Sequence, residues 1–330
     1  MRRDHVAHLV CPACGGSLVV HSTEVGTPIR VNEGTLRCTG CSALYPVVRS
    51  IPRFVPRENY ASGFGLQWLK HARTQYDSES GLNITGERFF RETRWPRKMS
   101  GERILEVGSG SGRFTEQAAS TGALVVSMDY SYAVEANFQS NGAYDNVLIV
   151  QADIYAMPFR HHYFDRCFCF GVLQHTPDVH RSFLALPPYL KPGGKLAADV
   201  YKTPPFWKRW FYTKYLVRPF VKNIAPGRLY ALCQKYIQLL WPLSRLIHRL
   251  PYGRQLNWML LIADYRDVYA LSDEQLKDWA LLDTFDMLSP AYDSPQTLET
   301  FTAWFQEANL TEIDVHYGYN GIEGRATKPR

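Results

Sequence analysis

A glycine-rich turn between a predicted strand and a predicted helix constrains this chain more than any other feature. Residues 104–107 form a short apolar run, Ile-Leu-Glu-Val, and residues 108–112 read Gly-Ser-Gly-Ser-Gly. Glycine lets the backbone turn sharply and lets a ligand approach main-chain atoms closely. Such a turn after a strand is typical of α/β proteins that bind a nucleotide-like ligand beside the sheet.

The segments around this turn alternate between strand and helix patterns. Ser294 and Pro295 predict the start of a last helix, because serine caps helices and proline suits the first helical position. Alternating strands and helices predict a doubly wound, largely parallel sheet of the α/β class. Further strands are expected at 124–128, 147–150, 166–170, 195–200, 312–317 and 322–327.

Acidic residues mark the ends of three consecutive strands. Glu106 precedes the turn, Asp129 lies 21 residues after Gly108, and Asp153 follows the third strand. Strand ends in an open α/β sheet point into the ligand crevice, so we expect the three carboxylates around one ligand. Glu106 would repel a pyrophosphate and attract an amino group, and Arg113 stands where the NAD fingerprint has glycine. The pattern disfavours a dinucleotide.

Residues 102–201 resemble the class I S-adenosylmethionine-dependent methyltransferases. The resemblance implies a Rossmann-like sheet of seven strands whose last strand is antiparallel, and S-adenosylmethionine as the cofactor. It rests on motifs in the family's order: the turn at 105–112, Met128-Asp129-Tyr130-Ser131, Ala152-Asp153-Ile154, residues 164–175, and Leu190-Lys191-Pro192-Gly193-Gly194.

The same resemblance implies contacts to the cofactor. It places Gly108 and Gly110 near the methionine part, with Glu106 attracting the ammonium group. It places Asp129 on the ribose, and Asp153 with Ile154 at the adenine. The full set of expected cofactor-binding residues is Glu106, Gly108, Gly110, Gly112, Asp129, Tyr130, Asp153, Ile154 and Gly171.

His175 follows the fourth strand, near the place where the methyl group should emerge, and is the candidate catalytic base. Alternatively, it caps a helix or fixes its loop. Gln174, Asp286 and Tyr292 are candidate substrate contacts, and packing or capping would also explain Asp286 and Tyr292.

Four cysteines in two C-x-x-C pairs predict a metal site near the N-terminus. Cys11 and Cys14 are followed, after 23 residues, by Cys38 and Cys41. Four thiolates at this spacing suit a closed, structural zinc site. A redox dithiol, the alternative, lacks the helix pattern that should follow it. The segment resembles the zinc-ribbon family that includes the activator subunit of tRNA and protein methyltransferases, here fused in cis.

Residues 202–254 contain eleven Lys and Arg, no Asp or Glu, and eleven aromatic residues, among them Trp207 and Trp210. Three interpretations remain open. The segment binds an anionic membrane surface, or it binds RNA, or it is a lid with a solvated basic face. Because it follows the fifth strand, it should lie over the acceptor in each case.

These features predict a domain order. We expect a zinc ribbon at 1–57, a helical cover at 58–101, a methyltransferase domain at 102–201 and 294–330, and a helical lid at 202–293. No apolar run is long enough to span a bilayer, and residues 1–12 lack the apolar core of a secretion signal. The expected location is the cytoplasm, with peripheral contact to the inner face of the membrane through 202–254.

The predicted function is methyl transfer from S-adenosylmethionine to a small-molecule, lipid-linked or glycan-linked acceptor. An RNA methyltransferase and a non-catalytic cofactor-binding adaptor are the alternatives, and nucleic acid is the less favoured partner. The sequence makes no prediction of oligomeric state.

Overall fold

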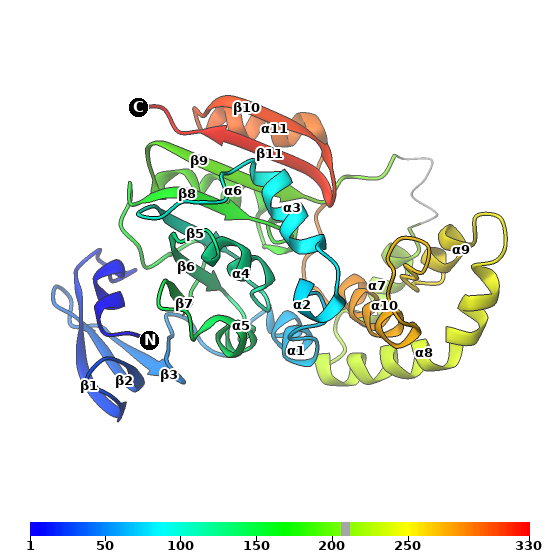
Figure 1. The fold of residues 1–330 in the computed structure, drawn as a ribbon, viewed down its shortest axis with the longest axis horizontal. Coiled ribbons are helices and arrows are strands. Elements are labelled where there is room, and N and C mark those ends of the chain that lie inside the picture. The colour runs from blue at the N-terminus through cyan, green and yellow to red at the C-terminus, as the bar shows by residue number, and fades with distance from the viewer. Residues whose placement is uncertain (206–211) are drawn as a thin grey trace.

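The computed structural model describes residues 1–205 and 212–330 (Figure 1), so Trp207 and Trp210 lie outside the described residues. Its centre is a seven-stranded sheet with the order β10-β11-β9-β8-β5-β6-β7. The strands are β5 (Arg103–Val107), β6 (Leu124–Asp129), β7 (Val147–Gln151), β8 (Phe164–Cys169), β9 (Leu190–Val200), β10 (Thr311–Gly318) and β11 (Gly321–Thr327).

The pairing confirms the predicted Rossmann-like sheet. β5 pairs in parallel with β6 and β8, β6 with β7, and β8 with β9. The last strand, β11, runs antiparallel to both β9 and β10. Since β5 has β6 on one side and β8 on the other, the strand order reverses there. Ligands of open α/β sheets bind at the carboxyl ends of the strands at such a switch point.

Helices cover both faces of this sheet because its strands are apolar on both sides. Leu105 and Val107 pack in one cluster with Phe183 of α6 (Val179–Leu184) and Phe305 of α11 (Leu298–Glu307). The alternate residue Ile104 packs in the opposite cluster, whose helices are α3 (Ile84–Thr93), α4 (Arg113–Ala119) and α5 (Val134–Asn141).

The last helix begins later than predicted. α11 starts at Leu298, and its cap is Thr297, whose hydroxyl accepts a hydrogen bond from the Thr300 amide at 3.1 Å. The predicted cap, Ser294, instead donates its backbone N–H to the carbonyl of Gln174 at 2.9 Å. Ser294 therefore binds the loop after β8 and does not cap the helix.

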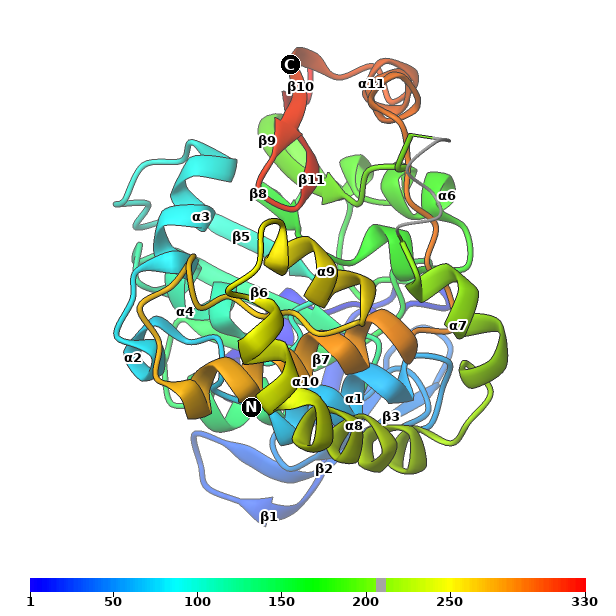
Figure 2. The ribbon, with the colours of Figure 1, turned by 90° about the vertical axis from the view of Figure 1, so that its right-hand side faces the viewer.

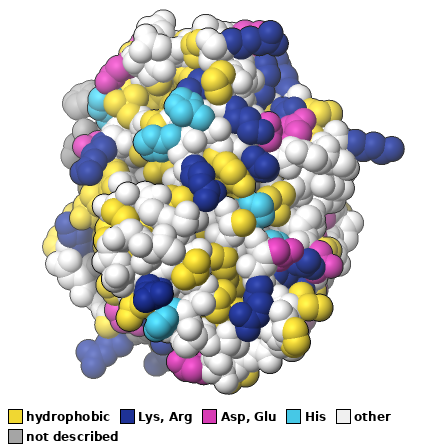
Figure 3. Space-filling model, turned by 90° about the vertical axis from the view of Figure 1, so that its left-hand side faces the viewer, with side chains coloured by type: hydrophobic (Ala, Val, Ile, Leu, Met, Phe, Trp, Pro, Cys, Tyr) yellow, Lys and Arg dark blue, Asp and Glu magenta, His cyan; other side chains and the backbone are white. Residues whose placement is uncertain are grey.

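The first 52 residues form a separate antiparallel sheet after the 3₁₀ helix η1 (Asp4–His8). Figure 3 views the molecule from this side, where basic, acidic, histidine and apolar side chains are interspersed. Its strands, in the order β1-β2-β3-β4, are β1 (Leu18–Gly26), β2 (Val31–Cys38), β3 (Leu44–Val48) and β4 (Ile51–Pro52).

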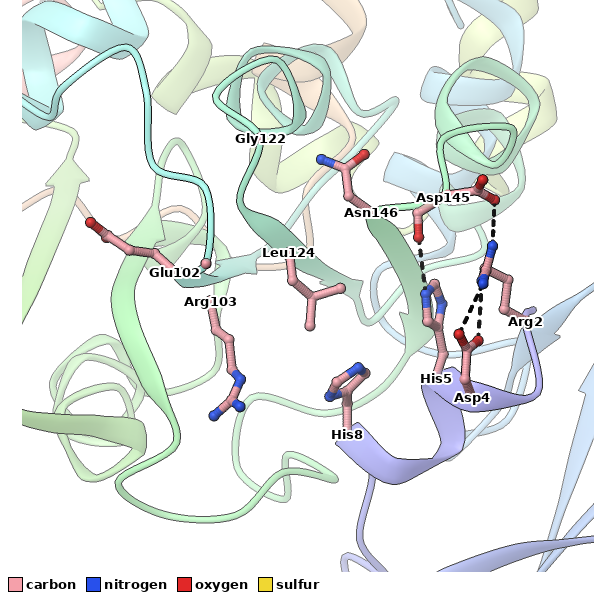
Figure 4. A pocket seen from close by; sticks show the side chains of 11 residues that line it. Arg2, Asp4, His5, His8, Glu102, Arg103, Gly122, Leu124, Asp145 and Asn146 are labelled. Carbon is pink, nitrogen blue, oxygen red and sulfur yellow. Dashed lines mark hydrogen bonds and ion pairs between the residues drawn. The ribbon is translucent and has the colours of Figure 1, made fainter.

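This small sheet, hereafter the ribbon, packs against the edge of the large sheet at β7. The Phe54 amide donates to the Gln151 carbonyl at 2.8 Å, and Arg53 pairs with Glu135 at 3.1 Å. A cavity of about 540 Å³ separates η1 from the amino ends of β5 and β6 (Figure 4). The glycine turn lies at the opposite, carboxyl end of β5, so η1 does not reach it.

Residues 202–293 are hereafter called the insertion, and its described residues, 202–205 and 212–293, include helices that lie in front of the carboxyl edge of the sheet (Figure 2). They share a core of their own, in which Leu229 and Ile237 pack near Leu276 and Phe285. Among the described residues, none of the helices combines the length and apolar character needed to span a bilayer. The insertion helices are α7 (Lys214–Val221), α8 (Pro226–Ile247), α9 (Gly253–Met259) and α10 (Asp273–Leu288). α8 and α10 contact α1 (Ser62–Lys70), and the side chain of Gln275 in α10 donates to the carbonyl of Glu79 in α2 (Asp77–Ser80) at 3.2 Å.

Candidate functional site

A cavity of about 1330 Å³ opens at the carboxyl ends of the parallel strands. The strand ends, the segment around α1, the insertion, the turn between β10 and β11 (residues 318–321) and Arg88 of α3 line it. The predicted site residues that line it are Gly108, Gly110, Asp129, Tyr130, Ile154, Gly171, His175 and Asp286.

The glycine turn forms part of the cavity wall. Gly108 has φ +84°, and a Cβ added there would stand 2.2 Å from the side chain of Val172. Gly110 has φ +53°, and a Cβ there would stand 2.9 Å from Nε1 of Trp68. Glycine at these two positions therefore allows both the left-handed backbone and the close approach of neighbouring side chains.

Asp129 ties this turn to β6. Its Oδ2 accepts a hydrogen bond from the Gly110 amide at 2.9 Å, and its Oδ1 accepts from the amide and hydroxyl of Ser131 at 2.8 and 2.7 Å. Burial raises the pKa of Asp129, although these donors favour the ionised form. Because a carboxylate has about four acceptor sites, capacity remains for a ligand. Next to it, Tyr130 stacks on Tyr60 at 4.8 Å.

Glu106 lies beneath the turn and is 1% exposed. One oxygen, Oε2, accepts hydrogen bonds from the hydroxyls of Thr115 and Ser127. The other, Oε1, has no partner among the described residues. Burial raises the pKa of Glu106 to about 7. A buried acceptor without a donor fits a cationic group of a ligand at this turn.

Five predicted site residues do not line the cavity. Glu106 and Gly112 lie behind the turn, and Asp153 closes a local turn by accepting from the Tyr155 amide at 2.9 Å. Gln174 is fully buried, and neither polar side-chain atom has a partner among the described residues. Tyr292 stands edge-on to Tyr60 at 5.3 Å.

His175 presents one ring nitrogen without a partner. Its Nδ1 lies 3.0 Å from the carbonyl oxygen of Tyr292. Because a carbonyl only accepts, Nδ1 carries the proton in the neutral ring, and Nε2 keeps its lone pair. Nε2 has no partner among the described residues, and the rings of Phe64 and Tyr201 pack on the imidazole at 5.0 and 5.3 Å.

The sequence did not lead us to predict several of the residues that line the cavity. Tyr60 and Trp68 come from the segment that was expected only to cover the domain. Asp283 of α10 also lines the cavity, and its carboxylate accepts a hydrogen bond from the hydroxyl of Tyr265 at 2.5 Å. Burial raises the pKa of Asp283 to about 7. The aromatic density of residues 60–68 was the one available signal for that segment.

The four paired cysteines converge as predicted. Their sulfur atoms all lie within 4.8 Å of one another, and Cys14 and Cys38 stand 3.4 Å apart. A tetrahedral zinc ion with Zn–S bonds of about 2.3 Å requires sulfurs about 3.8 Å apart. The amides of Gly40 and Cys41 donate to the sulfur of Cys38 at 3.3 and 3.4 Å, which supports a thiolate. The donor set and spacing fit zinc.

Purified protein should therefore contain about one zinc per chain by plasma mass spectrometry. Cys38→Ser should lose that zinc and melt the ribbon, because metal binding and ribbon folding are coupled. Cys233→Ser, which changes a buried cysteine of α8, is the control and should retain the metal. Full zinc content in Cys38→Ser would contradict this assignment.

Comparisons with known proteins match these two regions separately. Residues 105–198 match the family model for a methyltransferase domain, and residues 4–50 match the model for Trm112p-like proteins.

The curated relatives are methyltransferases. The chain is 30% identical over 129 residues to a demethylmenaquinone methyltransferase of Corynebacterium kroppenstedtii, covering 38% of this chain and 54% of that protein. It is 32% identical over 101 residues to a ubiquinone biosynthesis O-methyltransferase of Coxiella burnetii, covering 30% and 43%. The chain thus spans about half the length of the curated relatives it matches.

Among solved structures, the chain is similar to a Haloferax volcanii complex that contains the Trm112 methyltransferase activator. The identity is 11% and the TM-score 0.44, over 84% of this chain and 100% of that one. Residues 105–198 therefore carry a methyltransferase domain, and residues 4–50 carry a Trm112p-like domain whose four cysteines are placed to bind a metal.

Proposed function

We propose that the chain transfers a methyl group from S-adenosylmethionine to an apolar small-molecule or lipid-linked acceptor held beneath the insertion. One observation carries the proposal: a single cavity of about 1330 Å³ joins the glycine turn to the aromatic walls of the insertion. Pockets for one small ligand typically measure about 300–1,000 Å³, so this cavity has room for a cofactor and an acceptor together.

The residues at the sheet end of the cavity fit the cofactor. Behind the turn, the orphan oxygen of Glu106 suits its ammonium group, the backbone at Gly108 and Gly110 permits close approach, and Asp129 keeps about one acceptor site for a ribose hydroxyl. The Tyr60–Tyr130 pair offers an aromatic wall. When bound, the cofactor supplies an already activated methyl group, so the main task of the chain is to align the acceptor with it.

The insertion end of the cavity favours an apolar acceptor. Aromatic and aliphatic side chains predominate there, whereas nucleic-acid binding depends on Lys and Arg side chains that contact the phosphates. The curated relatives named above, whose names refer to quinones, support a ring-bearing acceptor of this kind. The apolar lining residues of the insertion are Tyr212, Tyr215, Tyr252, Leu256, Trp258, Met259, Leu261, Tyr265, Tyr269, Trp279, Leu282 and Met287.

His175 is the proposed base. The Tyr292 carbonyl holds the proton on Nδ1, so Nε2 can accept a proton from an acceptor hydroxyl or carbon acid as the methyl group is transferred. Phe64 and Tyr201 fix the ring by packing on it. Asp286, which accepts a hydrogen bond from Gln67 at 3.1 Å, is a proposed polar contact for the acceptor.

We also propose that the insertion rests on an anionic membrane surface. The exposed leucines of α8 include Leu239 at 77% and Leu246 at 58%, and α8 and its flanks carry basic residues but no acidic ones. At about 100° per residue, Leu232, Leu239, Leu243 and Leu246 share one side of the helix, turned away from the buried Cys233 and Ile237. An apolar stripe flanked by basic residues is typical of helices at the membrane interface.

His175→Gln should lower the single-turnover rate by about 10²–10⁴-fold, since it removes the base. The affinity for S-adenosylmethionine should hardly change. Labelled cofactor and membrane-lipid extract provide the assay. His180→Gln on α6, whose imidazole pairs with Glu307 and packs beside Trp304, is the control and should keep the rate. A normal rate in His175→Gln would contradict its role, and labelling of RNA instead of lipid would contradict the acceptor class.

The Glu106→Gln variant should change two measurable quantities, the free energy of unfolding and the affinity for S-adenosylmethionine. The folded pKa is about 7 against an ordinary 4.5, so the stability that this group contributes is full below pH 4.5 and is lost as the pH rises through 7. At pH 8 the free energy of unfolding of the variant should be roughly 2–3 kcal/mol higher than that of wild type, because neutral glutamine avoids the cost of a buried charge. Near pH 4.5 this difference should vanish.

The same variant should bind S-adenosylmethionine more weakly in calorimetry, because the negative partner of the ammonium group is gone. Urea titrations at both pH values measure the stability change. Glu87→Gln, an exposed position on α3, should alter neither quantity. Equal stability differences at both pH values, or unchanged affinity, would count against the proposed role of Glu106.

Leu239→Gln combined with Leu246→Gln should weaken vesicle binding by about tenfold or more, because two apolar side chains leave the bilayer. Wild type should co-sediment with vesicles that contain phosphatidylglycerol at low salt, and not with neutral ones. Ile29→Gln changes a ribbon residue that is 63% exposed and should sediment like wild type. Failure of wild type to sediment, or dimerisation through α8 in ultracentrifugation, would contradict membrane contact.

A further inference from the structure

The segment between α10 and α11 joins the insertion to the loop that carries His175. Its residues 290–296 are hereafter called the strap. The carbonyl oxygen of Tyr292 lies 3.0 Å from Nδ1 of His175, and the amide of Ser294 donates to the carbonyl of Gln174 at 2.9 Å. The strap therefore binds two consecutive residues of the loop after β8.

The first helix of the insertion, α7, holds the strap through two basic side chains. Nζ of Lys214 pairs with Oδ2 of Asp293 at 2.8 Å, and the guanidinium of Arg218 donates to the carbonyl of Pro290 at 2.8 Å. Residues four apart lie on the same face of a helix, so one face of α7 presents both cations to the strap. The side chains of Asp293 and Arg218 are 2% and 8% exposed, so water screens these contacts little.

The buried carboxylate of Asp293 depends on Lys214. Its second oxygen, Oδ1, has no partner among the described residues. A buried carboxylate that loses its cation is costly, so without Lys214 the Asp293 side chain should turn towards water. Asp293 directly follows Tyr292, and such a turn would therefore displace the carbonyl that contacts His175.

Lys214 also lies beside the aromatic ring that packs on the imidazole. Its Nζ is 5.4 Å from the ring centroid of Tyr201, and that ring stands edge-on to His175 at 5.3 Å. The strap fixes Tyr201 as well, because the amide of Gln296 donates to the Tyr201 carbonyl at 2.8 Å. One lysine thus contacts both the strap and a ring that packs on His175.

We propose that Lys214 is a positioning residue for His175. Its ion pair with Asp293 holds the Tyr292 carbonyl in place, and this carbonyl keeps the ring proton on Nδ1, so that Nε2 keeps its lone pair. The inference rests on the proposed function, in which Nε2 accepts a proton from the acceptor. A ring with the proton on Nε2 could not do so. The seating of α7 on the strap therefore decides whether the base is ready.

Nitrogen-15 NMR of protein with labelled histidine reads the tautomer directly, and His175→Gln identifies the signals by their loss. At pH 8, His175 of wild type should carry its proton on Nδ1. In Lys214→Gln it should populate both tautomers, and the single-turnover rate should fall about 10- to 100-fold, because the base is misplaced. Affinity for S-adenosylmethionine should hardly change. Lys214→Arg should restore most of both properties, and Lys222→Gln, at the exposed end of α7, should resemble wild type.

Because Lys214→Gln leaves a buried charge unpaired, a second variant guards against misfolding. Lys214→Gln combined with Asp293→Asn removes both charges, and a thermal melt checks its fold. Mixed tautomers in this folded variant would support the proposal, whereas the wild-type tautomer would overturn it. Equal losses of rate and cofactor affinity with an unchanged tautomer would indicate a structural role and also overturn it. Mixed tautomers with a normal rate would confirm the positioning and instead contradict the proposed role of His175 as base.

Discussion

The hydrogen bond from the Gly110 amide to Asp129 is the interaction on which the site depends. It joins the glycine turn after β5 to the end of β6, so two neighbouring strands share one wall of the cavity. With the turn fixed there, Gly108 can lie against Val172 and Gly110 under Trp68. Both contacts require glycine, because a Cβ at either position would clash with the neighbouring side chain. The same carboxylate thus shapes the wall and keeps about one acceptor site for a ligand.

The insertion has two different surfaces, one that lines the cavity and one that faces outward. Its aromatic side chains, such as Trp258 and Tyr265, line the cavity, while the leucines of α8 face outward beside arginines and lysines. A lid that served only to close the site would gain nothing from exposed leucines. The arrangement fits the proposal that the outer surface contacts lipid and the inner surface contacts an apolar acceptor, because the apolar side chains of both surfaces then face an apolar environment.

The sequence allowed prediction of features that depend on contiguous residues. The alternating strands and helices, the glycine turn after the first strand and the cysteine pairs have local signals, and the structure confirms the seven-stranded sheet and the cysteine cluster. Side-chain direction depends on packing instead. Asp153 and Gln174 follow the correct strands, yet neither lines the cavity, and Tyr60 reaches it from a segment with no motif. Ser294 satisfied the rules for a cap, but a tertiary contact with Gln174 uses it.

The ribbon reaches the cavity through a chain of hydrogen bonds. Arg53, just after β4, donates to the side chain of Gln151 at 2.9 Å, and Gln151 donates to the carbonyl of Tyr130 at 3.0 Å. Asn59, in the connecting segment, donates to the same carbonyl at 2.8 Å. Tyr130 lines the cavity, so the end of the ribbon helps to hold a cavity wall in place. Covalent fusion keeps this support present at every moment, whereas a separate subunit would supply it only when bound.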